Sequence, residues 1–578
     1  MHNAILKRFE RAVKKSEMYL KNIFPDLVEI KKESYPKSWL LNLEINHRSV
    51  QLTLSLPFDF PVSVPDIFVA DPNQYWLKTP HVEQNGKLCL YTNAAAISIN
   101  APEALIEDSL KRAEKILGIH DLSEFYSEFN SYWSFNNNEP VLSLEDDGGI
   151  PPSSYFYNSS LPFVLSSDKD NLLEWNKNFG RRVKATDLIT IERIDITELI
   201  SPSEFPNNTK ELLIFFKKYA PQKYELLFLH LKESKSNQFY FLRFIFKDTF
   251  VYAGIKVPGL NLIKTKGVLN GYKKNTIPHD LLISKTNLIL EHSKIERFNI
   301  NPIGYKHIHS RGGTGLDLSR KKVLIIGAGS LGSYLSHFMA KSGIGNITLC
   351  DNEWLSWDNI GRNILGAANV RKSKADSLID NLGNEMPHLK LNAIYKNFRD
   401  VLKDDEGLLK EQDLIICCVG NWGIEYDLNY WARQNKIEIP LVFGWLEKYS
   451  LAGHALFVHP LIGGCMKCGC DEWGVFSHRV TELQKEDFKS THGCSGYFMQ
   501  YGVIQQSPVV ILIAKLSIDV LTGKCNKSEL RTWIAPKSEF EQQSIIPETI
   551  WRGKMQNNIN GLLDSIEWSI NDECELCK

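Results

Sequence analysis

The spacing of hydrophobic and polar positions predicts an α+β domain at the start of the chain. Residues 1–24 repeat their apolar positions with a helical period, whereas residues 40–45 and 50–56 alternate like two antiparallel strands. Residues 102–119 predict another amphipathic helix, with a proline in the first turn, where its missing N–H costs nothing. We therefore expect a first domain over residues 1–140.

Short apolar runs dominate the middle of the chain. The runs LLIFFKKY, ELLFLHL, QFYFLRFIF and FVYAGIKV are continuous or alternating, as expected of strands. The segment LEDDGGIPPSSY precedes them and is rich in turn formers, which is typical of a linker. Few titratable residues cluster in this part, so we expect an α/β linker domain over residues 141–305 with no chemistry of its own.

The last part of the chain shows the pattern of a parallel sheet covered by helices. Residues 323–326 and 346–350 are β-branched apolar runs, typical of strands that are buried on both faces. The run DLIICCV predicts a further buried strand, and residues 503–521 predict a strongly apolar helix. We expect a Rossmann-like domain over residues 306–578, which makes the whole chain an α/β multidomain protein.

Composition excludes several classes of function. The chain has 578 residues, 43% of them hydrophobic, and a net charge of −1, which gives no electrostatic case for binding nucleic acid or a membrane surface. The N-terminus lacks the apolar core of a signal peptide, and we expect no other run to reach the length of a membrane span. The eleven cysteines are clustered, which favours metal-binding or catalytic thiols in a reducing cytoplasm over disulfides.

Three glycines follow the strand at residues 323–326 and indicate a nucleotide site. Gly327, Gly329 and Gly332 let the backbone turn tightly into a helix and bring its free N–H groups against a phosphate. Asp351 follows the next strand, at the spacing used to bond a ribose hydroxyl. The alternative is an ordinary glycine-rich connection.

Polar groups beyond Asp351 indicate which nucleotide binds. An amide, a guanidinium and an ammonium suit a triphosphate whose leaving group is pyrophosphate, and they are supplied by Asn359, Arg362, Asn363 and Lys374. The pattern D-x(7)-N-x-x-R-N with a later K-A resembles the ATP site of the ubiquitin-activating superfamily, which includes the ThiF and MoeB adenylyltransferases. The resemblance implies ATP and Mg²⁺ as cofactors.

One position departs from that family. The resemblance implies an Asp that helps to bind magnesium at the end of the strand DLIICCV, where this chain has Gly420. Glu425 or Asp427 in the following helix could substitute for it.

Two CxxC pairs indicate a structural zinc site. Cys465 and Cys468 form one pair, and Cys574 and Cys577 form the other, at the C-terminus. Four thiolates can close a tetrahedral site, and a similar placement in ThiF-like proteins favours zinc over a redox pair. Cys470 is an alternative ligand.

Cys494 is the expected nucleophile of this domain. It lies in the polar run STHGCSGYFMQYGV, just before the apolar helix, where a helix dipole can stabilise a thiolate. The pattern G-C-S-x(6)-G-V resembles the catalytic-cysteine loop of activating enzymes. A surface cysteine without function is the alternative.

A second cysteine motif lies in the first domain. In TPHVEQNGKLCLY, a turn at Asn85–Gly86 presents Cys89, after a segment in which prolines forbid helix. The order of elements and this motif resemble the ubiquitin-conjugating fold, which implies that Cys89 carries a thioester. His81 stands where that family has an oxyanion-stabilising Asn; an imidazole can donate to an oxyanion, take a proton from an amine, or be structural.

Together these features resemble the fused activating and conjugating enzymes of bacterial CBASS antiphage operons. The resemblance implies a homodimer that adenylates the C-terminus of a cGAS-like nucleotidyltransferase or ubiquitin-like protein and moves it through Cys494 and Cys89 to a target amine. Two alternatives stay open. One is activation of a sulfur-carrier protein, and the other is a nucleotide-binding scaffold that has lost adenylation.

Overall fold

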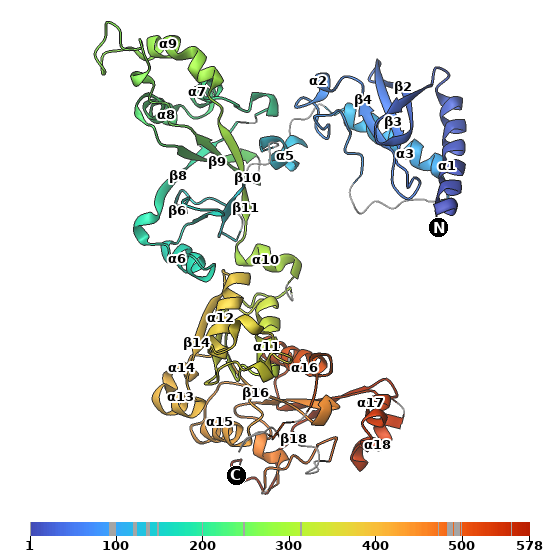
Figure 1. Ribbon diagram of the computed structural model, residues 1–578, viewed down its shortest axis with the longest axis vertical. Coiled ribbons are helices and arrows are strands. Elements are labelled where there is room, and N and C mark those ends of the chain that lie inside the picture. The colour runs from blue at the N-terminus through green and yellow to red at the C-terminus, as the bar shows by residue number, and fades with distance from the viewer. Residues whose placement is uncertain are drawn as a thin grey trace.

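The computed structural model describes most of the chain (Figure 1). The described residues are 2–91, 100–119, 124–134, 139–146, 149–198, 200–246, 249–312, 315–471, 473–482, 489–490, 497–498, 500–556 and 558–577.

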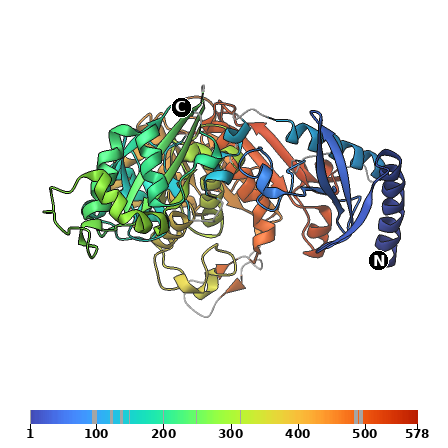
Figure 2. The ribbon, with the colours of Figure 1, turned by 90° about the horizontal axis from the view of Figure 1, so that it is seen from above.

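The first part is a four-stranded antiparallel sheet flanked by helices. Its strands lie in the order β1-β2-β3-β4, and Figure 1 and Figure 2 both place α1 at the outer end of this part. The elements are α1 (His2–Ile23), β1 (Val28–Lys32), β2 (Tyr35–Ile45), β3 (Arg48–Leu56), β4 (Asp66–Val69), α2 (Pro72–Tyr75) and α3 (Pro102–Leu117). The predicted helices and strands of this part are therefore confirmed.

The middle is a closed barrel in the order β10-β11-β5-β7-β6-β8-β9. Its strands are β5 (Val141–Ser143), β6 (Ser153–Tyr157), β7 (Phe163–Ser166), β8 (Ile189–Ile196), β9 (Gln238–Phe246), β10 (Thr249–Val257) and β11 (Glu296–Pro302). Its helices are α6 (Lys169–Asn178), α7 (Thr209–Tyr219), α8 (Pro221–Glu233) and α9 (His279–His292).

Two of the four runs predicted as strands in the middle are helices, so that prediction was wrong. LLIFFKKY lies in α7 and ELLFLHL lies in α8. The side chain of Asn208 caps α7 by accepting a hydrogen bond from the N–H of Glu211, and Pro221 starts α8. A short continuous apolar run has no period that separates a buried strand from a buried helix, so the caps decided the outcome.

The segment before the barrel packs into the barrel core. It contains α4 (Glu124–Ser127) and α5 (Phe129–Trp133). The rings of Phe129 and Trp133 stack with centroids 5.5 Å apart, and both contact the ring of Phe244 in β9. The Trp133 indole N–H donates to the carbonyl of Gly254 at 3.2 Å. These contacts hold α4 and α5 in place against the barrel.

The last part is an eight-stranded sheet in the order β14-β13-β12-β15-β16-β17-β20-β21. The first five strands are parallel and the last three run antiparallel to their neighbours. The strands are β12 (Lys322–Ile326), β13 (Asn346–Cys350), β14 (Lys390–Ile394), β15 (Leu414–Cys417), β16 (Leu441–Leu446), β17 (Ala452–Val458), β20 (Glu529–Ile534) and β21 (Leu562–Glu567), with a separate pair β18 (Lys489–Ser490) and β19 (Tyr497–Phe498). The helices are α10 (Tyr305–Gly312), α11 (Ser330–Lys341), α12 (Lys374–Glu385), α13 (Phe398–Asp404), α14 (Glu406–Lys410), α15 (Trp422–Gln434), α16 (Val503–Leu521), α17 (Lys537–Gln542) and α18 (Thr549–Gln556).

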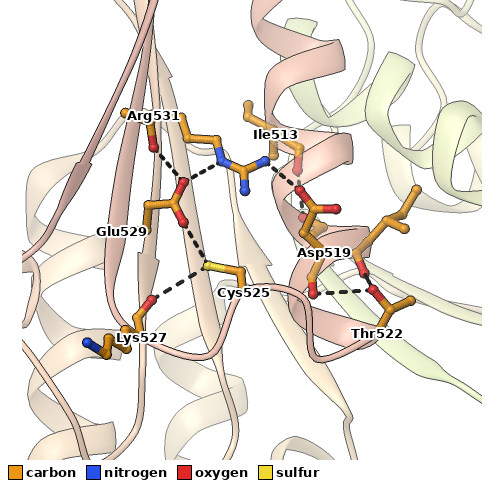
Figure 3. Close-up of polar contacts among 10 residues, drawn as sticks. Ile513, Asp519, Thr522, Cys525, Lys527, Glu529 and Arg531 are labelled. Atoms are coloured by element: carbon orange, nitrogen blue, oxygen red, sulfur yellow. Dashed lines mark hydrogen bonds and ion pairs between the residues drawn. The ribbon is translucent and has the colours of Figure 1, made fainter.

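Helix α16 covers the centre of this sheet, against α11, β16 and β17. By length and composition it could also cross a membrane, contrary to the expectation that no run reaches that length, although a core helix passes the same test. At its C-terminal end, Arg531 donates to Asp519 and to Glu529, each at 2.7 Å, and the Cys525 thiol donates to Glu529 at 3.0 Å (Figure 3). This network attaches the helix end to β20.

Candidate nucleotide and thiol sites

Two of the three predicted glycines meet a steric requirement, and the third, Gly329, lies next to open space. Gly327 has a φ of +96°, which L side chains rarely adopt. A Cβ on Gly332 would lie 1.8 Å from the carbonyl oxygen of Gly327, so the first turn of α11 can pack only with glycine there. A Cβ on Gly329 would meet no atom within 4 Å. The open side of the turn is therefore at Gly329, where the N–H groups that start α11 can reach an anion.

Asp351 and Asn363 brace this loop. The Asp351 carboxylate accepts from the N–H of Ala328 at 2.6 Å, and burial raises its pKa. The Asn363 amide donates to the carbonyl of Ala328 at 2.9 Å and is 5% exposed. Both side chains therefore hold the backbone of the loop.

The other three predicted nucleotide ligands each have a partner within the protein. Lys374 is buried at the start of α12 and forms an ion pair with Glu353. The Arg362 guanidinium lies 5.6 Å from the ring centre of Tyr501. Asn359 accepts from the N–H of Ser356 at 3.3 Å.

Two residues of this site were missed by sequence reasoning. The hydroxyl of Tyr501 lies 2.8 Å from the hydroxyl of Ser330, the first residue of α11. Gln506 in α16 is fully buried and donates to the carbonyls of Ser330 at 3.4 Å and Arg362 at 3.3 Å. Only their position at the start of the apolar helix could have pointed to them. They tie the chain that follows Cys494 to the nucleotide loop.

The backbone conformation at the end of β15 favours Gly420 over the Asp that the family resemblance implies at this position. Gly420 has a φ of +63°, which favours glycine. Glu425 in α15 is 5% exposed, burial raises its pKa to about 7, and one carboxylate oxygen has no partner among the described residues. Asp427 instead pairs with Arg399 at 2.5 Å. Of the two predicted substitutes, Glu425 is the carboxylate with a coordination position to offer to Mg²⁺.

A cavity of about 340 Å³ adjoins this strand end, with Trp422, Trp445 and Phe476 among its walls. Gly420 and Glu425 also line it. The cavity thus has aromatic walls together with charged groups, because Glu447 and Arg479 line it as well as Glu425.

The four cysteines predicted to bind zinc converge on one point. Their sulfur atoms all lie within 4.8 Å of one another, with neighbours at 3.5 to 3.9 Å. A tetrahedron with Zn–S bonds of about 2.3 Å has edges of about 3.8 Å, so the site fits zinc. Cys470 points elsewhere, with its sulfur donating to the carbonyl of Met466 at 3.7 Å. The metal would crosslink the C-terminal tail to the loop that follows β17.

Cys494 lies outside the described residues, but the chain is anchored on both sides of it. Before it, Glu447 accepts from the N–H and the hydroxyl of Thr481 at 2.6 and 2.7 Å. After it, Tyr501 contacts Ser330 in the nucleotide loop. Six residues lie between Cys494 and Tyr501, so the covalent chain allows at most about 25 Å between the two.

Cys89 lies on a small antiparallel turn. Gly86 has a φ of +83° at the predicted Asn85–Gly86 turn, and the N–H of Cys89 donates to the carbonyl of His81 at 2.9 Å. The exposed Cys89 thiol donates to the Glu83 carboxylate at 3.7 Å. Partial burial of the sulfur, which removes water from the thiolate, raises the pKa of Cys89 to about 11, and the negative charges of Glu83 and Glu128 add to this effect.

His81 is held by the segment that packs on the barrel. Its φ is +61°, and its N–H donates to the hydroxyl of Tyr132 at 2.9 Å. Its ring Nδ1 lies 2.9 Å from the carboxylate of Glu128, a hydrogen bond that raises the pKa of His81. Glu128 and Tyr132 were not predicted as site residues, because nothing in the sequence links them to a turn almost fifty residues earlier.

Two family models match the chain. Residues 22–141 match prokaryotic E2 family B, and residues 306–544 match the ThiF family. The barrel lies between the two matched ranges.

Two curated relatives match different extents of the chain. An ATP-dependent ubiquitin transferase-like protein Cap2 of Pseudomonas aeruginosa is 23% identical over 77% of this chain and 80% of its own length. A molybdopterin-synthase adenylyltransferase of Escherichia coli is 34% identical over 22% of this chain, which spans half of that relative. Among solved structures, E. coli MccB with MccA-N7isoASN aligns with 45% of this chain and with 68% of the MccB chain. The two are 18% identical, with a TM-score of 0.32, which is a weak overall similarity.

Proposed function

We propose that this chain, a fusion of a prokaryotic E2-like domain with a ThiF-type adenylyltransferase domain, conjugates the C-terminus of a partner protein to an amine. The observation that carries the proposal is that one chain holds both a braced nucleotide loop and an exposed thiol on an E2-like turn.

Adenylation is the first step. The partner's C-terminal carboxylate attacks the α-phosphate of ATP, because a carboxylate is unreactive until AMP becomes its leaving group. The N–H groups at Gly329 and the side chains of Arg362 and Lys374 face the phosphates, and pyrophosphate leaves. Mg²⁺ neutralises phosphate charge when bound, and Glu425 is the carboxylate that would hold it.

Two thiols then carry the acyl group. Cys494 displaces AMP to form a thioester, which keeps most of the activation and releases the nucleotide. Cys89 of the same or a paired chain takes the acyl group from Cys494 by thiol exchange. A target amine finally attacks the Cys89 thioester and forms an amide.

The partner and setting follow from the likeness to Cap2. We infer that the activated protein is a cGAS-like nucleotidyltransferase, that the chain acts in CBASS antiphage defence in the cytoplasm, and that it pairs through its adenylation domain. Zinc on the four cysteines is structural, since four thiols leave no open coordination position.

The test uses the full chain, ATP, Mg²⁺ and the C-terminally intact product of the neighbouring gene on a non-reducing gel. We expect an adduct that a reductant removes, that Cys494→Ala abolishes and that stays on Cys494 in Cys89→Ala. ATP binding without an adduct in any of these proteins would overturn the proposal and favour a scaffold.

A further inference from the structure

The Cys89 site contains more acid–base groups than its sequence motif accounts for. The thiol, Glu83 and His81 come from the turn, whereas Glu128 and Tyr132 come from the segment packed on the barrel. In the described chain, the Glu83 carboxylate contacts the thiol, the charge of Glu128 acts on it, and Glu128 in turn holds the His81 imidazole.

Glu83 is placed to exchange a proton with the sulfur. Val82 pairs with Leu88 across the turn, so residues 83 and 89 lie diagonally across it, and the Cys89 Sγ donates to the Glu83 Oε1 at 3.7 Å. The neighbouring Lys87 pairs with Asp66 at 2.8 Å instead, and Glu83 has no ion pair in the described part of the chain. Its carboxylate is thus exposed and available as a base.

His81 is placed differently, because carboxylates surround its ring. Glu128 lies 2.9 Å from Nδ1 and Glu124 lies 3.9 Å from Nε2. Tyr132 donates to the second oxygen of Glu128 at 3.1 Å and fixes its orientation. The hydrogen bond that the ring makes to the Glu128 carboxylate raises the pKa of His81, and a carboxylate near each ring nitrogen favours the ring as a hydrogen-bond donor over its use as a base.

We propose that Glu83 is the proton shuttle of the Cys89 site and that Glu128 is a positioning residue that keeps His81 as a hydrogen-bond donor to the oxyanion. This inference rests on the proposed conjugation reaction. It assigns to separate side chains the two roles that His81 alone could have filled.

The shuttle balances in both half-reactions. When Cys89 is loaded, Glu83 takes the S–H proton as the sulfur attacks the incoming thioester. The C–S bond to Cys494 breaks, and Glu83 passes the proton to the leaving Cys494 sulfur, which restores the carboxylate for the second half-reaction. When an amine attacks the Cys89 thioester, a C–N bond forms and Glu83 takes an N–H proton. The C–S bond then breaks, and Glu83 returns the proton to the sulfur, whose high pKa requires it.

The test measures discharge from Cys89 without ATP. A peptide thioester of mercaptoethanesulfonate loads Cys89 in the full-length Cys494→Ala protein, and peptide mapping by mass spectrometry follows its single-turnover transfer to free lysine or to hydroxylamine. Hydroxylamine is uncharged at neutral pH and depends less on a base. Because this assay does not require adenylation, it still measures the roles of Glu83 and Glu128 if the chain turns out not to activate a partner with ATP.

We expect Glu83→Gln to slow discharge to lysine about 100-fold and discharge to hydroxylamine less than about tenfold. Glu128→Gln should slow both about tenfold, because oxyanion stabilisation does not depend on the nucleophile. Glu107→Gln, an exposed carboxylate on α3 that pairs with Lys111, is the matched control and should change neither rate.

A double-mutant cycle tests the positioning role. In a His81→Asn background the amide donates without a carboxylate partner, so adding Glu128→Gln should have little further effect. Lysine discharge unchanged in Glu83→Gln would overturn the shuttle. An equal Glu128→Gln effect in both backgrounds would overturn the positioning role, and unchanged thermal melting of each variant excludes misfolding as the cause.

Discussion

The nucleotide loop and the Cys89 turn are both held in backbone conformations that L side chains rarely adopt, but they are held by different means. At the loop, glycine supplies the positive φ at Gly327, and the braces Asp351 and Asn363 follow within 40 residues. At the turn, His81 itself has a φ of +61° and is fixed by Glu128 and Tyr132 on a segment packed against another domain.

The difference teaches that one site is specified locally and the other depends on domain packing. The loop can form wherever its strand and helix form. The turn has its observed geometry only while α4 and α5 pack on the barrel. Substitutions at the two sites should therefore have different consequences.

Gly332→Ala should abolish ATP binding. Its Cβ would lie 1.8 Å from the carbonyl oxygen of Gly327, so the loop must open. Gly329→Ala is the matched change, because its Cβ meets no protein atom within 4 Å, and it should leave thermal stability unchanged. Isothermal calorimetry with ATP and thermal melting measure both. Equal loss of stability in the two variants would contradict the steric assignment.

Alkylation of Cys89 should be slow at neutral pH. Since the pKa of Cys89 is about 11, its thiolate fraction is about 100-fold below that of an ordinary thiol at pH 7 and rises tenfold per pH unit up to about pH 11. Glu83→Gln removes a negative charge and should speed alkylation at pH 7. Iodoacetamide labelling with peptide mapping gives the pH profile. A plateau below pH 9 would contradict the raised pKa of Cys89, to which partial burial contributes most and the nearby carboxylates contribute next.

Tyr132→Phe should slow Cys89 discharge about fivefold and leave ATP binding intact. The change removes the hydroxyl that accepts from the N–H of His81 and donates to Glu128, a loss of about 1 kcal/mol. Tyr126→Phe, in the same segment and on the side that faces the barrel, is the control. Equal discharge rates in the two variants would show that the Cys89 turn does not depend on its contacts with Tyr132.

Zinc removal should affect only the nucleotide half. Cys574→Ser opens the four-thiol cluster and should lower the melting temperature of the adenylation domain by about 5 °C or more. Discharge from Cys89 should stay unchanged, because the turn has no contact with that cluster among the described residues. Metal analysis should show one zinc per chain in the unchanged protein and none in Cys574→Ser. A fall in the discharge rate would contradict the independence of the two sites.

Sequence predicted the nucleotide half well because its signals are local. The strand, the glycines and the acid follow one another at fixed spacing, and the two CxxC pairs predict the four-cysteine cluster directly. The run DLIICCV was also predicted to be a buried strand, and burial raises the pKa of its two cysteines, Cys417 and Cys418.

Sequence failed where packing between distant segments decides. The apolar runs of α7 and α8 carry no period that separates helix from strand. Glu128 and Tyr132 have the spacing of one helical face, but nothing marks that face as part of the Cys89 site. Tyr501 and Gln506 were missed for the same reason.

The most direct test of the central claim is the position of the acyl group on a trapped chain. Cys89→Ser would hold the partner as an oxygen ester that resists thiol reductants. The protein is incubated with ATP, Mg²⁺ and the neighbouring gene product, and intact and peptide mass spectrometry follow. The account predicts a mass increase of the partner minus water on the peptide that carries residue 89. A partner mass that never leaves Cys494, or that appears without ATP, would contradict it.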